Sequence, residues 1–180
     1  GVEFGYIYNA FGTEVTIIEM MANLLPVEDD DVSDAITKSY RKAGINCLTD
    51  TKVTGTRDNG SSVTITVENS SGSKEITADC CLVAIGVAPV LPGGQQPKLT
   101  DRGWVEISDR YETSLPNVYA IGDIAGPPWL AHTASFEAMQ CVEGIFVEGT
   151  AVKRVGDFPG CTYCYPEVAS VGKTERALKE

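Results

Sequence analysis

The first residues of the chain carry apolar side chains at helical spacing, followed by a short continuous apolar run. Phe4, Tyr8 and Phe11 recur at i, i+4 and i+7, which predicts a helix with these side chains on one buried face. Gly12 is expected to end this helix. Residues 15–18 form a β-branched run, the pattern of a parallel strand that is buried on both faces.

The next stretch repeats this order of helix and strand. The acidic residues 28–31 follow Pro26, and they can cap and charge-complement a helix that runs to about residue 43 and stops at Gly44. Residues 45–48 open the next strand. The order helix, strand, helix, strand indicates a parallel sheet with crossover connections, so we expect an α/β fold.

From residue 52 the pattern changes to alternation of apolar and polar residues, which is clearest at 63–68. Turn-forming residues cluster at 58–60 and 70–72, so this region is predicted to be an antiparallel β-meander. A buried strand is expected next at 80–85. Within it, Cys80 and Cys81 are interpreted as reduced core residues, because a free cysteine behaves as a small hydrophobe.

The second half of the chain has weaker periodicity. The elements predicted there are a connector rich in Pro, Gly and Gln at 87–102, short strands at 104–107 and 117–121, a helix near 135–147, a change of composition from about Val155, and the start of another helix at Thr174. Both ends of the chain look cut, so we expect a fold that is truncated at both ends.

Charge and hydropathy disfavour several kinds of partner. The 180 residues include 14 Lys+Arg and 25 Asp+Glu, a formal net charge of -11, which repels nucleic acid phosphates and anionic lipids. The sequence has no run of about 18 apolar residues that would cross a bilayer. We therefore expect a soluble protein with no nucleic acid and no membrane partner.

Two carboxylates stand just after apolar strands. Glu19 follows the run 15–18, and an acid at this place in a dinucleotide-binding fold can accept hydrogen bonds from adenosine ribose hydroxyls. No arginine follows it that would neutralise a 2′-phosphate, so NAD is favoured over NADP. Asp123 follows Gly122 and a predicted strand, and its carboxylate can hold polyol hydroxyls. Taken alone, an acid at a strand end such as Glu19 is more often a solvated surface residue, and the stretch up to Asp123 can also be a strand followed by an Ile-Gly-Asp turn.

Six blocks of sequence resemble, in order and with appropriate separations, the class I pyridine nucleotide-disulfide oxidoreductases, and among them the dihydrolipoamide dehydrogenases. They are GVEFG at 1–5, VTIIE at 15–19, VAIGVAP at 83–89, TSLPNVYAIGD at 113–123, LAHTASFEA at 130–138 and PEVASVGKTE at 166–175. The resemblance implies a Rossmann-type FAD/NAD(P)-binding fold with an antiparallel β-meander. It further implies an NAD-binding domain at 1–86, a central FAD-contacting segment at 87–153 and the start of an interface domain at 154–180.

The resemblance also implies positions that contact the cofactors. Gly1 matches the third glycine of Gly-x-Gly-x-x-Gly, and Glu3 matches a glutamate that lies between nicotinamide and flavin. The implied NAD contacts are Gly1, Val2, Glu3, Glu19, Val53 and Gly86. After Gly86, many relatives carry Arg-x-Pro where this chain has Val87-Ala88-Pro89, so any contact made by that arginine is absent.

On the flavin side, Asp123 matches the aspartate that binds the ribityl and phosphate region. The stretch from Trp129 to His132 matches backbone that covers the isoalloxazine ring at a helix N-terminus. The implied FAD contacts are Gly122, Asp123, Trp129, Leu130, Ala131 and His132. Relatives often have Met at the position of Trp129, which changes the side-chain packing expected there.

No residue of the chain is assigned the catalytic chemistry. The family's redox Cys-x-x-x-x-Cys and its catalytic His with a partner Glu are expected outside this sequence. His132 is the only histidine and can in principle act as an acid or base, but the resemblance favours a cofactor-covering role. Cys161 and Cys164 can form a redox pair or half a zinc site; we favour a packing role and expect no metal site.

The implied activity of the complete enzyme is oxidation of dihydrolipoamide through an active-site disulfide and FAD, with hydride transfer to NAD⁺. The implied partners are dihydrolipoamide on a lipoyl domain, a second copy in a homodimer, and components of a 2-oxo acid dehydrogenase or glycine cleavage complex. The expected location is bacterial cytoplasm or the matrix of a mitochondrion or plastid. Two alternatives stay open: another FAD-dependent disulfide reductase, of glutathione or mercuric type, and a catalytically silent nucleotide-binding or subunit-interaction module.

Overall fold

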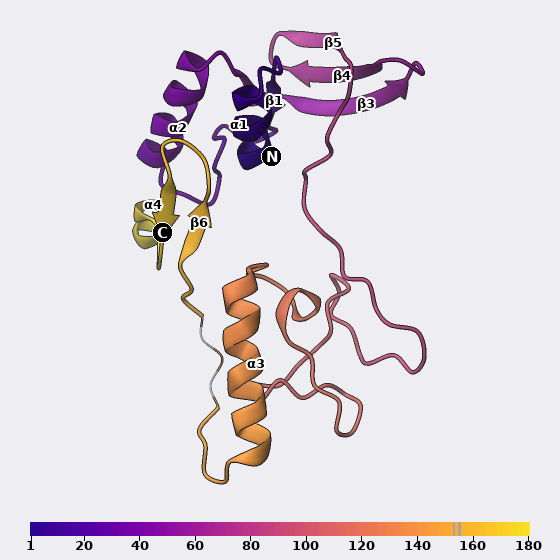
Figure 1. Cartoon of the computed structure of the whole chain (residues 1–180), viewed down its shortest axis with the longest axis vertical. Helices are drawn as coiled ribbons and strands as arrows, with labels where there is room; N and C mark the ends of the chain where they lie inside the picture. The colour runs from indigo at the N-terminus through magenta and orange to yellow at the C-terminus, as the bar shows by residue number, and fades with distance from the viewer. Residues whose placement is uncertain (153, 155) are drawn as a thin grey trace. The chain divides into compact units, whose positions relative to one another are not determined.

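The computed structural model describes residues 1–152, 154 and 156–180, which form two compact units. The first unit combines residues 1–85 with 161–180, and the second comprises 86–160 (Figure 1). The predicted division into three functional segments stays a prediction. Its boundary at Lys153, like the change of composition at Val155, lies outside the described residues.

Helices and strands are both present, so the α/β class is confirmed. In chain order the elements are α1 (Val2–Ala10), β1 (Thr16–Ile18), α2 (Asp30–Lys42), β2 (Asn46–Leu48), β3 (Lys52–Asp58), β4 (Val63–Asn69), β5 (Gly72–Ala78), the short 3₁₀ helix η1 (Gly122–Ala125), α3 (Ala131–Phe146), β6 (Gly160–Thr162), β7 (Val168–Ser170) and α4 (Glu175–Lys179). Among the described residues, no helix combines the length and hydropathy that crossing a bilayer requires.

The predicted parallel pairing is confirmed in the first unit. β1 and β2 run parallel, with Thr16 opposite Asn46. α1 packs on β1 at Gly5, where an added Cβ would lie 2.7 Å from Cδ1 of Ile17. Because glycine has no Cβ, it allows the helix backbone to come this close to the strand.

The predicted buried face of α1 is wrong. Phe4, Tyr8 and Phe11 are exposed, Phe11 to 84%, whereas Val2 and Gly5 are buried. Apolar residues lie around much of this short helix, so their spacing alone does not single out one face. The side that carries glycine approaches the sheet, and the aromatic side chains point elsewhere.

A continuous apolar core fills the first unit between α1, α2 and the β1-β2 pair. Its buried members are Val2, Leu24, Leu25, Ile36, Tyr40, Ile45, Cys47, Cys164 and Val168. The Tyr40 hydroxyl donates a 2.9 Å hydrogen bond to the carbonyl of Val2, which ties α2 to the first turn of α1. Burial raises the pKa of the Tyr40 phenol, so this side chain keeps the proton that it donates.

The predicted antiparallel meander is confirmed. β3, β4 and β5 form a three-stranded sheet in that order, with antiparallel neighbours. Both predicted turn clusters connect its strands. In the first turn Gly60 N donates to Asp58 Oδ1 at 2.8 Å, and in the second Ser71 N donates to Asn69 Oδ1 at 2.9 Å.

The strand predicted at 80–85 is not formed, and this is a second correction. Cys80 and Cys81 are exposed rather than buried, and Ile85 is 93% exposed. The run has the composition of a buried strand, but no other strand pairs with it in the part of the chain that the structure describes. An apolar run forms a ladder only when a neighbouring strand supplies backbone partners.

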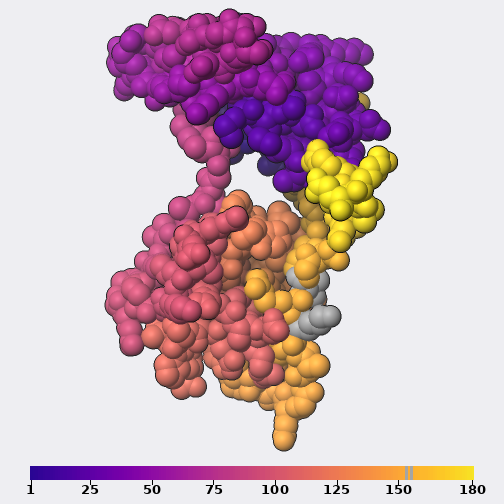
Figure 2. Space-filling view, turned by 180° about the vertical axis from the view of Figure 1, so that it is seen from behind, coloured from indigo at the N-terminus to yellow at the C-terminus, as the bar shows by residue number. Residues whose placement is uncertain are grey.

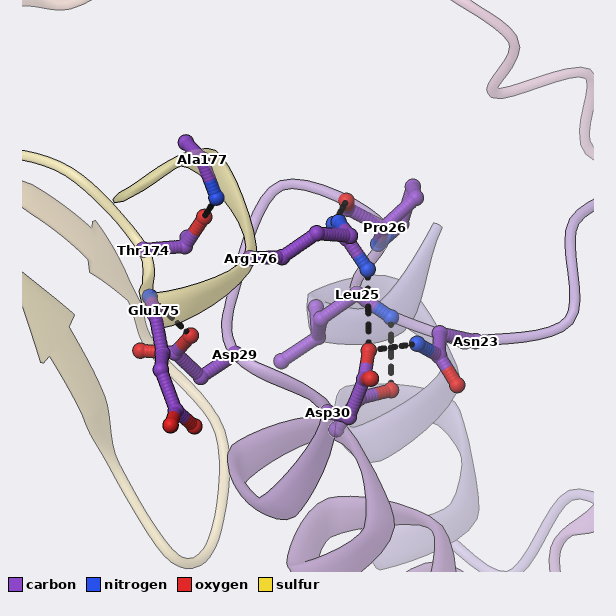
Figure 3. Close-up of polar contacts among 10 residues, drawn as sticks. Asn23, Leu25, Pro26, Asp29, Asp30, Thr174, Glu175, Arg176 and Ala177 are labelled. Atoms are coloured by element: carbon purple, nitrogen blue, oxygen red, sulfur yellow. Dashed lines mark hydrogen bonds and ion pairs between the residues drawn. The ribbon is translucent and has the colours of Figure 1, made fainter. Parts of the chain in front are cut away.

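The last residues of the chain return to the first unit, where Figure 2 shows them in yellow against the indigo and violet N-terminal residues. Figure 3 shows the polar contacts of this return. Asp29 Oδ1 accepts a 2.8 Å hydrogen bond from Glu175 N, at the start of α4. Arg176 binds Asp30 at 2.9 Å and the carbonyl of Pro26 at 3.0 Å.

These contacts change the role expected of the acidic residues before α2. Asp29 is the N-cap residue of α2, as predicted, but its side chain makes no capping bond to that helix. Its side chain instead accepts a hydrogen bond from the first turn of α4. The predicted helix start at Thr174 is confirmed, since its hydroxyl accepts a 3.2 Å hydrogen bond from Ala177 N.

The second unit is built around α3. This helix begins at Ala131, four residues before its predicted start near residue 135. The strands predicted at 104–107 and 117–121 are reduced to two isolated bridges, Leu99 with Val105 and Glu112 with Tyr119. These segments are too short and too separated for a continuous ladder.

Candidate functional site

The first candidate site lies at the carboxyl end of β1, where Glu19 directly follows the strand. The backbone of Glu19 is fixed on both sides, because its N–H donates to Leu48 O at 2.9 Å and its carbonyl accepts from Thr51 N at 3.0 Å. Its half-buried carboxylate accepts a 2.8 Å hydrogen bond from Met21 N through Oε1. The backbone position of Glu19 and one of its carboxylate oxygens are thus both fixed by hydrogen bonds.

The first turn of α1 lies at the same edge. α1 connects to β1 through residues 11–15 and packs on it at Gly5, so the start of the helix is at the carboxyl end of the strand. Gly1 precedes the helix and provides no side-chain cap. Free N–H groups at a helix N-terminus bind phosphate well. The structure therefore brings Gly1, Val2 and Glu19 to one edge of the parallel pair.

The other predicted NAD contacts have different surroundings. The Glu3 carboxylate accepts a 2.8 Å hydrogen bond from Tyr163 N, so it is directed at the segment that returns to the first unit. Val53 lies in β3 with its side chain exposed. Gly86 has φ +124° and is the first residue of the second unit. The roles of these residues at a nucleotide stay predictions.

The second candidate site is the turn at Gly122 and Asp123, where η1 begins. Gly122 has φ +68°, a conformation that favours glycine, and a Cβ there would lie 3.0 Å from Cβ of Ala134 in α3. Gly122 N donates a 2.7 Å hydrogen bond to Glu137 Oε2. The turn is thus held tightly against α3, and the side chain of Asp123 is exposed beside it.

The N-terminus of α3 has the features of a binding site for an electron-rich group. Its N-cap residue, Leu130, makes no capping bond, and the first turn holds no acidic residue. Thr133 is 1% exposed, and its hydroxyl oxygen has no hydrogen-bond partner among the described residues. A helix end with uncapped N–H groups attracts negative charge, and an unpaired buried hydroxyl indicates that a polar partner is missing. This helix end therefore offers free N–H groups to an electron-rich ligand.

Two side chains next to this helix end have partners within the second unit. His132 Nε2 lies 2.9 Å from the carbonyl of Pro159, so this nitrogen donates when it carries the proton. Trp129 packs on Trp104 with ring centroids 5.4 Å apart. This contact gives the Trp129 side chain a packing partner.

Glu137, which is 7% exposed and contacts the Gly122 turn, was not predicted as a site residue. A signal for it was present. Thr133, Glu137 and Cys141 are spaced at i, i+4 and i+8, so they share one face of α3, and the structure buries all three. A glutamate in the middle of such a face is a buried charge that needs a specific partner.

The cysteines divide into two groups, and none forms a disulfide. Cys47, Cys141 and Cys164 are buried, and burial raises the pKa of each of these thiols. Cys164 packs in the core, as predicted, whereas Cys161 is exposed. The described residues contain no group of three or more His, Cys, Asp and Glu side chains that could hold a metal ion.

This division predicts two rates of thiol labelling. Cys80, Cys81 and Cys161 should react with an aromatic disulfide reagent at pH 8 at least about tenfold faster than the buried three. A raised pKa lowers the thiolate fraction at a given pH, and the thiolate is the nucleophile. Mass spectrometry of the labelled peptides measures each rate, and the same experiment in urea is the control. Slow labelling of Cys80 and Cys81 would show that residues 80–85 are buried after all.

Comparison with known proteins identifies relatives of this chain. The model of the family described as pyridine nucleotide-disulphide oxidoreductase matches residues 1–138. Dihydrolipoyl dehydrogenase of Rhizobium etli is 41% identical over 186 residues, which cover 100% of this chain and 38% of that protein. The mitochondrial dihydrolipoyl dehydrogenase of Caenorhabditis elegans is 37% identical, with 100% of this chain and 38% of that protein covered. The chain thus spans about two fifths of the length of these relatives.

The solved structures give the class of the fold. RclA from Escherichia coli, an HOCl-induced flavoprotein disulfide reductase, superposes with a TM-score of 0.86 at 23% identity, covering 99% of this chain and 41% of that one. This likeness confirms the predicted FAD/NAD(P)-binding fold. The family match over residues 1–138 is more specific: the chain belongs to the pyridine nucleotide-disulphide oxidoreductase family.

Proposed function

We propose that this chain is the cofactor-binding part of a dihydrolipoyl dehydrogenase, which oxidises dihydrolipoamide to the cyclic disulfide and reduces NAD⁺. The two relatives described above, which bear that name, support this choice. Bound FAD would carry the two electrons between the dithiol and the nicotinamide. The identity of the substrate and the direction of hydride transfer are parts of this proposal.

In the first unit, the residues at the end of β1 would bind NAD. The amides at the start of α1 would bind the pyrophosphate, and the Glu19 carboxylate would accept hydrogen bonds from the ribose hydroxyls. The backbone of Glu19 is fixed by two hydrogen bonds, and its carboxylate accepts a third from Met21 N. A preset acceptor of this kind selects a free 2′-hydroxyl and repels a 2′-phosphate, so NAD is preferred over NADP.

In the second unit, the residues around α3 would bind FAD. The exposed Asp123 carboxylate would hold ribityl hydroxyls, and the first N–H groups of α3 at Ala131 and His132 would face the electron-rich part of the ring. The observation that carries this assignment is the uncapped start of α3 with the unpaired, buried hydroxyl of Thr133 in its first turn. That combination supports a polar ligand at this helix end.

The proposal also covers the partners. A lipoyl domain carrying dihydrolipoamide is the proposed substrate carrier, and a homodimer is the proposed assembly. Components of a 2-oxo acid dehydrogenase or glycine cleavage complex are the proposed larger partners. These rest on the names of the relatives together with the family match.

Steady-state kinetics of the complete enzyme test the function. We expect dihydrolipoamide to drive NADH formation, and Glu19→Ala to raise the KM for NAD⁺ about tenfold, since a lost hydrogen bond to a charged acceptor is worth about 1.5 kcal/mol. The matched control is Glu14→Ala, which removes an exposed glutamate just before β1 and should leave KM unchanged.

The alternatives give different results in the same assay. Reduction of glutathione disulfide or of mercuric ion with a nicotinamide cofactor, without turnover of dihydrolipoamide, would assign the chain to another disulfide reductase. A protein that binds nucleotide but turns over none of these substrates would support a silent nucleotide-binding module. Either outcome would contradict the proposed substrate.

A further inference from the structure

A buried carboxylate in α3 links the two parts of the proposed flavin site. Glu137 is 7% exposed, and its Oε2 accepts a 2.7 Å hydrogen bond from Gly122 N. Moving a carboxylate out of water is costly unless it is hydrogen-bonded, and bonds to an ionised acceptor are stronger than neutral ones. A carboxylate at this buried position therefore depends on its hydrogen bond with Gly122 N.

The bond serves the start of η1. The N-cap residue of this short helix is Ile121, whose side chain has no acceptor, so the helix lacks a cap of its own. Glu137 supplies an acceptor for Gly122 N from a different helix. The contact fixes the orientation of the first peptide of η1, and the side chain of Asp123 projects from the next residue.

A second contact fixes the same turn against α3. Gly122 approaches Ala134 so closely that an added Cβ would lie 3.0 Å from the Ala134 Cβ. Ala134 and Glu137 are three residues apart and so lie on the same side of α3. One contact limits how near the turn comes to the helix, and the other sets its position along the helix.

The segment before η1 is also attached to α3. Tyr111 is fully buried, and its hydroxyl donates a 2.8 Å hydrogen bond to Gln140 Oε1, less than one helical turn after Glu137. The segment before η1 and η1 itself are thus both attached to the middle of α3 by polar contacts. At the start of α3, the N-cap residue Leu130 makes no side-chain capping bond.

From these contacts we infer that Glu137 is a positioning residue for the proposed flavin site. It holds the Gly122 turn at a fixed position along α3. Asp123 and the first N–H groups of α3 can then bind the same ligand. This inference rests on the proposed function, because it assumes that the ligand is FAD. Glu137 itself is not expected to touch the flavin.

The test compares three variants of the complete enzyme. Glu137→Ala removes the acceptor, Glu137→Gln keeps an acceptor of the same shape without charge, and Glu143→Gln removes an exposed charge from the same helix as the control. Two quantities are measured in each: hydrogen–deuterium exchange of the Gly122 amide in the apoprotein, and the dissociation constant of FAD from the quenching of its fluorescence.

We expect Glu137→Ala to speed exchange of the Gly122 amide at least about tenfold and to weaken FAD binding by about 10- to 100-fold, the range for loss of a hydrogen bond to a charged group. Glu137→Gln should restore most of both properties, because its side-chain carbonyl can still accept the bond. Glu143→Gln should match the unmodified enzyme. Rescue by glutamine separates a specific acceptor from general loss of packing.

Other outcomes overturn the inference in distinguishable ways. If the unmodified enzyme binds FAD and Glu137→Ala binds it equally well, the positioning role is wrong while the proposed function stands. If Glu137→Gln is as impaired as Glu137→Ala, the role of the acceptor is wrong. If the unmodified enzyme binds no FAD, the proposed function and this inference both fail, even where the exchange data confirm the contact with Gly122.

Discussion

Truncation of Ile36 to alanine should lower the free energy of unfolding of the first unit by about 2 to 5 kcal/mol. Ile36 lies in the middle of α2 and is 0% exposed, within the core shared with β2 and the returning C-terminal segment. Removing three methyl or methylene carbons there loses their burial and leaves a cavity that a close-packed core fills only in part. Urea unfolding followed by circular dichroism measures the loss.

The matched control for this variant is Ile85→Ala in the same unit. Ile85 is 93% exposed, so the same truncation should change the free energy of unfolding by less than about 0.5 kcal/mol. Equal losses at the two positions would contradict the structure. They would indicate that residues 80–85 form the buried strand that their composition predicts.

Replacement of Asp123 by alanine should weaken FAD binding by about 10- to 100-fold, the second large effect that we expect. The carboxylate is exposed on a turn that is fixed against α3 by Gly122. A ligand hydroxyl that loses this charged acceptor loses one of the stronger hydrogen bonds that a protein can make. Fluorescence titration of the apoprotein with FAD measures the change.

The control for Asp123→Ala is Asp109→Ala, which removes another exposed aspartate from the same unit. Both variants change the net charge equally, so any long-range effect on an anionic ligand is the same. We expect FAD binding to be unchanged in Asp109→Ala. Equal FAD affinities of the two variants would show that Asp123 does not bind the flavin.

The parts of the fold that local pattern can determine were predicted correctly. The meander follows from alternation of apolar and polar residues with turn clusters between them, because each strand pairs with its neighbour in sequence. The stops at Gly12 and Gly44 follow from the positive φ of +88° that both adopt, since glycine reaches this conformation without strain. These features need no information from distant residues.

Several features that depend on distant contacts were not predicted correctly. The face of α1 that is buried depends on where glycine meets Ile17, and the strand at 80–85 depends on a partner strand. The use of Asp29 by α4 joins residues 146 positions apart. Sequence spacing reports which residues share a face, but it does not report what that face meets.

The candidate site shows the same division. Glu19 and Asp123 were predicted as site residues because an apolar run followed by an acid is visible in the sequence. Glu137 was missed because its function depends on an amide 15 residues away in the chain. The unpaired hydroxyl of Thr133 is equally invisible in the sequence, since a lack of partners is a property of the folded unit.

We propose that one chain holds a nicotinamide dinucleotide at the end of β1 and a flavin at the start of α3. The most direct measurement is an experimental structure of the complete enzyme with FAD and NAD⁺ bound. We expect the Glu19 carboxylate within hydrogen-bonding distance of the adenosine ribose of NAD⁺, and Asp123 with the first turn of α3 against FAD. Density for either cofactor at other residues, with Glu19 and Asp123 facing only solvent, would contradict the account.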